Sequence, residues 1–197
     1  MGMILILASG SRRRQELLTK VGISYRVMEA DIEESLPNDV PIEEAVAALA
    51  LKKAAWVESR CPRDWILAAD TVVVLENVVL QKPKDRDDAA RMLRHLSGRS
   101  HEVFTGFCLR NGKLDRTRKG VARTVVTMKT LSPKEIEGYV ETGEPMDKAG
   151  AYGIQGIGAM FITKIYGSYT NVVGLPLAEV VDMLMEEGVA SPWEGLS

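Results

Sequence analysis

Residues 65–75 read Trp65-Ile66-Leu67-Ala68-Ala69-Asp70-Thr71-Val72-Val73-Val74-Leu75, an apolar run that a single charged residue interrupts. Such a run is typical of a strand buried in the middle of a sheet. A carboxylate buried there without a partner costs several kcal/mol or becomes neutral. We therefore expect a cation or a metal ion beside Asp70, although a purely structural ion pair would explain the same pattern.

The segments around this strand show strand and helix patterns in no strict alternation. Residues 3–7, 25–28, 78–80, 101–110 and 160–165, together with a segment that ends at about Met128, are expected strands. Two turns are expected, at Glu76-Asn77 and, as a tight hairpin, at Asn111-Gly112. Helices are expected at 11–21, 41–60 and 85–96, after the capping box Ser132–Glu135, and up to the stop at Gly188.

This mixture predicts an α/β or α+β fold with a mixed sheet. No internal repeat, low-complexity tract or linker composition divides the 197 residues, so one domain spanning 1–197 is the simplest expectation. In the helix expected at 85–96, the spacing of Ala89, Met92, Leu93 and Leu96 predicts one buried face.

The composition excludes several classes of protein. An apolar fraction of 46% with 26% charged residues is typical of a globular chain, and a formal net charge of −2 gives no general attraction for nucleic acid or membranes. No stretch is long and apolar enough for a membrane span, and the N-terminus lacks the pattern of a signal peptide. Cys61 and Cys108 are expected to be reduced thiols. We therefore expect a cytoplasmic protein.

A basic cluster follows the first expected strand, in the order Ser9-Gly10-Ser11-Arg12-Arg13-Arg14. Positive side chains in the first turn of a helix oppose the helix dipole, so the cluster is favourable only if an anion binds there. Free backbone N–H groups and arginine forks both suit phosphate oxygens. A solvated basic turn is the alternative explanation.

Two lysines add candidate cations. On the helix expected at 41–60, Lys53 falls near the centre of the apolar face, while Lys52 falls on its flank. Lys53 is therefore either a long side chain that reaches solvent or an inward-facing cation that suits Asp70 and a phosphate. Lys82-Pro83 lies a dozen residues beyond Asp70 on a returning strand, and is a weaker signal.

A glycine-rich segment at residues 147–158 could approach a ligand closely, since glycine lacks a side chain. Tyr152 could stack on a base and Gln155 could hydrogen-bond to it, although a turn-rich connection would look the same. Histidine chemistry is not expected, because His95 lies opposite the core face of its helix and His101 stands alone. The remaining candidates are carboxylates, lysines and arginines, which suit hydrolysis of a polyphosphate with a divalent metal.

These residues resemble the Maf family of nucleotide pyrophosphatases over nearly the whole chain. The matching motifs are Ala8-Ser9-Gly10-Ser11 with Arg13-Arg14, Leu49-Ala50 with Lys53-Ala54, Ala69-Asp70-Thr71, Lys82-Pro83, the segments 96–101 and 144–156, and Val173-Gly174-Leu175-Pro176-Leu177. Arg12 departs from the family, which usually has proline there. The absence of this proline should reduce the rigidity of the start of the helix without removing the anion site.

The resemblance implies a fold like that of the inosine triphosphate pyrophosphatases, with an elongated mixed sheet, flanking helices and two lobes around a cleft. It implies a cytoplasmic house-cleaning enzyme that needs a divalent metal and uses Asp70 as general base. Substrate choice in the family is associated with the positions of Arg13, Thr71 and Gln155, which here resemble the dTTP and UTP branch. Members often form dimers, although no pattern here locates an interface.

We therefore expect a nucleoside triphosphate pyrophosphatase that releases a monophosphate and pyrophosphate. In this hypothesis Glu33 and Asp70 hold a Mg²⁺- or Mn²⁺-class ion. Thr71, Gln155 and Tyr152 contact the base. The phosphates bind to Ser9, Ser11, Arg13, Arg14, Lys53 and Lys82. Two alternatives stay open: a non-enzymatic, nucleotide-binding regulator of septum formation, and a pyrophosphatase of the 7-methyl-GTP type.

Overall fold

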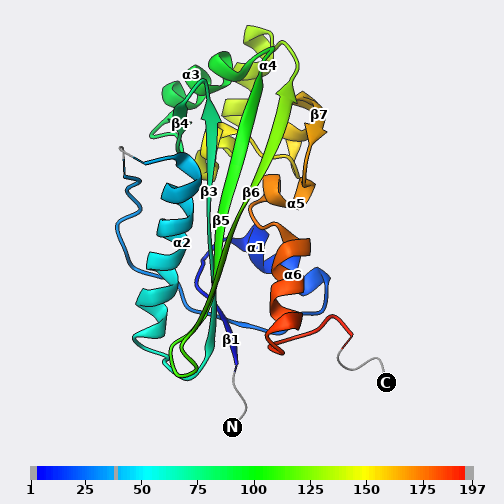
Figure 1. Cartoon of the computed structure of the whole chain (residues 1–197). Helices are drawn as coiled ribbons and strands as arrows, with labels where there is room; N and C mark the ends of the chain where they lie inside the picture. The colour runs from blue at the N-terminus through cyan, green and yellow to red at the C-terminus, as the bar shows by residue number, and fades with distance from the viewer. Residues whose placement is uncertain (1–3, 38–39, 194–197) are drawn as a thin grey trace. The chain divides into compact units, whose positions relative to one another are not determined.

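The computed structural model describes residues 4–37 and 40–193, which form two compact units (Figure 1). Unit 1 contains the chain up to Asp70, Thr105–Ala122 and the chain from Gly174 onward. Unit 2 contains Thr71–Phe104 and Arg123–Val173. Three strands run through both units: β3 (Trp65–Leu75), β5 (Ser100–Asn111) and β6 (Arg116–Met128).

The strands form one seven-stranded sheet in the order β2-β1-β3-β5-β6-β7, with β4 paired to β3. In unit 1, β1 (Leu5–Leu7) pairs in parallel with both β2 (Arg26–Val27) and the first part of β3. In unit 2, β4 (Val78–Leu80) is antiparallel to β3, and β7 (Ile162–Tyr166) is antiparallel to β6. The sheet is therefore mixed, and the prediction of a mixed α/β fold is confirmed.

Unit 1 is built around helix α2 (Ile42–Glu58), which lies along the strands in Figure 1. A Cβ atom on Gly106 of β5 would collide with the α2 backbone at Val46, so a glycine is needed where helix and strand touch. One core cluster of this unit combines residues of β1, α2, β3 and β5, among them Ile6, Ala54 and Ile66. The unit also contains α1 (Arg12–Lys20) and α6 (Leu177–Glu186).

Unit 2 surrounds a second apolar core with shorter elements. Helix α3 (Arg86–Leu96) packs against α4 (Pro133–Glu141), and α5 (Tyr169–Val173) ends the unit. Three 3₁₀ helices lie between α4 and β7: η1 (Glu144–Asp147), η2 (Ala149–Ala151) and η3 (Ile157–Phe161). The predicted face of α3, with Ala89, Met92, Leu93 and Leu96, is buried in this core.

Several local predictions are confirmed. Strand β3 has the predicted bounds, and Glu76 and Asn77 turn the chain with φ of 50° and 66°. Asp85 caps α3 by accepting a hydrogen bond from the Asp88 amide at 2.8 Å, and Ser132 forms the predicted capping box with Glu135.

Other local predictions are wrong. Asn111 remains in β5 and its side chain accepts a hydrogen bond from the Leu114 amide at 3.0 Å, so the loop is Gly112–Asp115 instead of a turn centred on Asn111-Gly112. The left-handed residue of this loop is Asp115, with φ of 50°. The helices expected from residues 11 and 41 begin one residue later, because Ser11 and Pro41 are the N-cap residues of α1 and α2, and Ser11 makes no capping side-chain hydrogen bond. The strand expected at 160–165 starts only at Ile162, because η3 precedes it.

The remaining differences concern the ends of elements. Met3, which we expected at the start of the first strand, lies outside the described residues. Within the described part of the chain, no helix combines the length and the apolar character needed to cross a bilayer.

Candidate active site

The charge inside β3 is paired with the charge inside α2. Lys53 Nζ donates a hydrogen bond to Asp70 Oδ1 at 2.7 Å, and both residues belong to unit 1. Lys53 is 6% exposed and Asp70 is 8% exposed, so the pair is almost fully withdrawn from water. The cation that the sequence predicted beside Asp70 is therefore Lys53, and its ammonium faces inward.

A second carboxylate contacts the same lysine. Glu34 Oε1 lies 2.6 Å from Lys53 Nζ, although 53% of the Glu34 side chain is exposed. Glu33, the predicted metal ligand, is exposed, and its backbone carbonyl accepts a hydrogen bond from Lys52 Nζ at 3.1 Å. The acidic residue next to the buried pair is thus Glu34, which the sequence reasoning missed.

The first turn of α1 points one arginine inward. Arg14 is buried, and it donates hydrogen bonds to the Gly174 carbonyl at 2.7 Å and to Ser9 Oγ at 3.0 Å. Burial lowers the pKa of the Arg14 guanidinium, against the opposing effect of the Asp70 carboxylate, which raises it. Arg14 therefore adds positive charge to the surroundings of Asp70 from the interior of unit 1.

The turn before α1 brings its serines together. Ser9 is buried, and its hydroxyl accepts a hydrogen bond from the Ser11 amide at 3.3 Å as well as from Arg14. A Cβ atom on Gly10 would lie 2.6 Å from Oε2 of Glu29, an exposed side chain that can move aside. Arg13 is partly buried in the first turn of α1, which contains no acidic residue. The predicted anion site of this turn thus keeps its positive character.

Three predicted site residues belong to unit 2. Thr71 directly follows Asp70 on β3 and is partly buried, and Lys82 is exposed just after β4. Gln155 is exposed on the loop between η2 and η3. The inclusion of these three residues in one site with Lys53 and Asp70 stays a prediction.

Tyr152 does not lie on the surface. It is 5% exposed in the core of unit 2, where its hydroxyl is 2.7 Å from His101 Nε2 and its ring meets the His101 ring edge-on. Burial raises the pKa of Tyr152 and lowers that of His101 to about 4. The prediction that Tyr152 stacks on a base is therefore wrong, and His101 is not alone.

Asp70 and Glu34 are the carboxylates of unit 1 considered as ligands of a divalent cation. Within residues 4–37 and 40–193, no group of three or more histidine, cysteine or acidic side chains is arranged to hold a metal. Asp70 and Glu34 supply two oxygens around the position of one ammonium group. Mg²⁺ commonly binds to one or two protein carboxylates and completes its shell with water and substrate phosphates, so this pair fits such an ion.

Comparisons with known proteins agree over most of the chain. The dTTP/UTP pyrophosphatase of Anaeromyxobacter sp. (strain Fw109-5) is 46% identical over 197 residues, covering 96% of this chain and 92% of that protein. The dTTP/UTP pyrophosphatase of Moorella thermoacetica is 49% identical over 187 residues, covering 94% of this chain and 95% of that protein. Among solved structures, a HAM1 protein from Coxiella burnetii is 15% identical, with a TM-score of 0.48 over 94% of this chain and 100% of that chain.

A family model also matches the chain directly. The model described as Maf-like protein covers residues 4–187, from the residue before β1 to the residue after α6. With relatives of 46% to 49% identity that extend over more than nine-tenths of the sequence, this match leaves one assignment. The chain belongs to the Maf family.

Proposed function

We propose that this protein is a nucleoside triphosphate pyrophosphatase that hydrolyses dTTP and UTP to the nucleoside monophosphate and pyrophosphate. The observation that carries the proposal is the buried pair of Lys53 and Asp70. Glu34 contacts the same ammonium group, and the positive charge of Arg14 interacts with Asp70. The relatives named dTTP/UTP pyrophosphatase support the choice of reaction. The activity acts on free nucleotides in the cytoplasm.

The cationic groups of unit 1 bind the triphosphate. Phosphoryl transfer depends on positioning and on neutralising charge at the phosphate oxygens. The N-terminal N–H groups of α1 and the arginine forks of Arg13 and Arg14 suit those oxygens, and Ser9 and Ser11 add hydroxyl donors. Lys53 contributes a point charge from the same unit. Lys82, in unit 2, keeps the phosphate-binding role expected from the sequence. Lys53 contacts two carboxylates in this structure, so an arriving phosphate replaces one of them as a partner of the ammonium group.

Asp70 acts on the attacking water. Lys53 contacts Oδ1, so Oδ2 is the oxygen that orients the water and accepts its proton as it attacks the α phosphorus. The bond between the α phosphorus and its bridging oxygen breaks, and pyrophosphate leaves with that oxygen. The inward-facing ammonium fixes the direction of the Asp70 carboxylate, which a general base requires.

A divalent ion of the Mg²⁺ or Mn²⁺ class completes the proposal. When bound, it neutralises phosphate charge and polarises the reacting water. Asp70 and Glu34, whose carboxylates both contact Lys53 Nζ, would hold it. Glu33, the ligand expected from the sequence, points its backbone carbonyl at Lys52 and is the weaker candidate.

The nucleotide panel tests the proposal directly. Purified protein with Mg²⁺ is given dTTP, UTP, CTP, dGTP and 7-methyl-GTP, and released pyrophosphate and orthophosphate are measured separately. We expect pyrophosphate from dTTP and UTP, and its loss on chelation of the metal. Binding of dTTP without turnover would favour the non-enzymatic regulator, and a preference for 7-methyl-GTP would favour the sister branch.

A further inference from the structure

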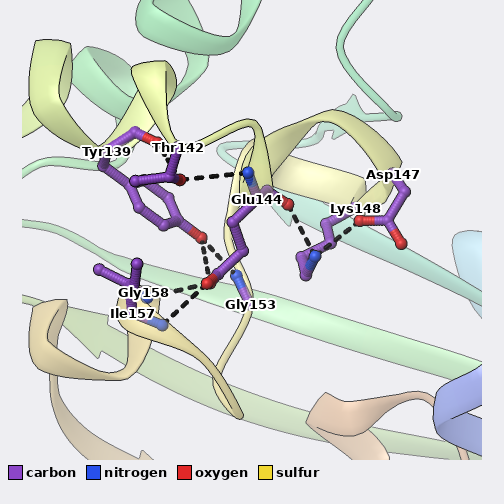
Figure 2. A network of polar contacts seen from close by, with 8 residues as sticks. All are labelled: Tyr139, Thr142, Glu144, Asp147, Lys148, Gly153, Ile157 and Gly158. Atoms are coloured by element: carbon purple, nitrogen blue, oxygen red, sulfur yellow. Dashed lines mark hydrogen bonds and ion pairs between the residues drawn. The ribbon is translucent and has the colours of Figure 1, made fainter.

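The glycine-rich loop of unit 2, residues 153–158, is fixed by a carboxylate (Figure 2). Glu144, the first residue of η1, accepts hydrogen bonds from the Ile157 amide at 2.9 Å and from the Gly158 amide at 3.1 Å. Its Oε1 also accepts a hydrogen bond from the Tyr139 hydroxyl at 2.8 Å. One side chain thus binds the C-terminal end of the loop.

The same pair binds the other end of the loop. The Tyr139 hydroxyl accepts a hydrogen bond from the Gly153 amide at 3.0 Å while it donates to Glu144. The Tyr139 ring is buried and packs edge-on against Phe161 at 5.0 Å between ring centroids. Tyr139 and Glu144, which we call the loop clamp, therefore hold residues 153 and 157–158 at once (Figure 2).

The clamp explains why two positions of the loop, 156 and 158, are glycine. A Cβ atom on Gly156 would collide with the Glu144 carboxylate, and one on Gly158 would lie 2.6 Å from the Tyr139 hydroxyl. We predicted these glycines to allow close approach of a ligand. The structure shows that at positions 156 and 158 they allow close approach of the clamp.

Glu144 holds the loop as a charged acceptor. Burial raises the pKa of its carboxyl, but hydrogen bonds from the Gly158 and Ile157 amides and from Tyr139 outweigh that effect, and the pKa lies below its usual value. Hydrogen bonds from amides to an ionised carboxylate are about twice as strong as those between neutral groups. Lys148 Nζ fixes the turn that carries Glu144, since it donates to the Glu144 carbonyl at 2.7 Å.

Gln155 lies at the exposed middle of the clamped loop. The residues two positions away on either side, Gly153 and Ile157, both donate amide hydrogen bonds to the clamp, while the Gln155 side chain is exposed. We propose that the loop clamp positions Gln155 and thereby sets which base the enzyme accepts. The inference rests on the proposed function, in which Gln155 contacts the base, and it makes Tyr139 and Glu144 positioning residues for specificity.

The first experiment compares Glu144→Gln with the parent protein. Glutamine keeps the shape of the side chain but loses the charge that holds the amides, so the loop loosens. We expect the ratio of kcat/KM for dTTP to that for dGTP to fall about tenfold, which corresponds to one charge-assisted hydrogen bond. Faster amide hydrogen exchange at Gly153, Ile157 and Gly158 should accompany the change. Glu137→Gln, an exposed charge on α4, is the matched control and should leave the ratio unchanged.

The second experiment asks whether the clamp acts through Gln155. In a Gln155→Ala background, Glu144→Gln should change the dTTP to dGTP ratio by less than twofold, because the group that it positions is gone. An equal fall in both backgrounds, or no fall in either, would overturn the inference. If Glu144→Gln does not fold, Tyr139→Phe removes only the bridging hydroxyl and must show the same dependence on Gln155. A parent protein without activity on dTTP would instead refute the proposed function.

Discussion

Two carboxylates of this chain are held in opposite ways. Asp70 in unit 1 is hydrogen-bonded to another side chain, that of Lys53, which Glu34 also contacts. Glu144 in unit 2 is bonded to backbone amides at two successive positions, Ile157 and Gly158. In the first arrangement a ligand can replace one partner of the ion pair. In the second, the carboxylate fixes the conformation of a loop.

This difference separates chemistry from geometry. An ion pair between side chains can rearrange when a polyphosphate arrives, because each side chain can turn to a new partner. A carboxylate that satisfies backbone amides cannot leave without freeing those amides, and a buried unsatisfied amide costs roughly 1–3 kcal/mol. We therefore expect mutations around the Lys53–Asp70 pair to impair turnover or metal use, and mutations in the clamp to change selectivity.

The largest effect is expected at Asp70. Asp70→Asn keeps the size of the side chain but removes the base, so pyrophosphate release from dTTP should fall by about 10²–10⁴-fold. Initial rates with Mg²⁺ measure the loss, and circular dichroism shows whether the variant is folded. Asp182→Asn, an exposed change on α6, is the matched control. A folded Asp70→Asn variant that turns over dTTP at the parent rate would remove Asp70 from the mechanism.

The next effect compares two neighbouring lysines. Lys53→Met leaves the buried Asp70 carboxylate without its hydrogen-bonded cation, and breaking a buried pair in this way costs about 3–5 kcal/mol of unfolding free energy. Arg14 compensates in part, so we expect the lower end of that range. Lys52→Met removes an exposed ammonium and should cost less than about 1 kcal/mol. Urea unfolding of both variants measures the difference, and equal losses would contradict the importance of the buried pair.

The unit 1 pair was predictable from the sequence because each charge interrupts an apolar pattern. Asp70 breaks an apolar strand run, and Lys53 falls in the apolar stripe of a helix, so both must face inward. No such pattern separates Glu33 from Glu34, since both lie in an irregular acidic loop. No periodic pattern therefore favours Glu33 over Glu34, and in the structure it is Glu34 that contacts Lys53.

The clamp was not predictable for a different reason. Its hydrogen bonds join α4 and η1 to residues 153–158, a loop that ends in the first turn of η3, and this segment has no periodic pattern that would predict them. Tyr152 was misplaced because its partner, His101, lies 51 residues earlier in the chain. The motif that contains Tyr152 and Gln155 combines a core residue with an exposed one, and the residue types alone do not distinguish them.

A pH titration sharpens the comparison from the side of unit 2, where His101 is buried beside Tyr152. Burial lowers the pKa of His101 from 6.5 to about 4, so the unfolded chain binds a proton in that window that the folded chain does not. Stability from this residue is fully present above pH 6.5 and is lost as pH falls towards 4, by about 3 kcal/mol. The free energy of unfolding, measured with urea between pH 4 and 7, should therefore fall more steeply with decreasing pH for the parent than for His101→Gln. Parallel curves would show that His101 does not titrate as its burial demands.

The smallest effect on stability is expected at Glu34, although its ion pair is as short as that of Asp70. Half of the Glu34 side chain is exposed, so Glu34→Gln should change the unfolding free energy by less than about 1 kcal/mol. Its effect should appear in metal use: we expect the Mg²⁺ concentration for half-maximal activity to rise several-fold, because one of two carboxylates around the cation position is lost. Glu33→Gln is the matched control, with the same change one residue earlier on an exposed side chain. If Glu33→Gln raised the Mg²⁺ requirement and Glu34→Gln did not, the metal would belong to the residue chosen from the sequence, and the ion pair of Glu34 with Lys53 would be only a surface contact.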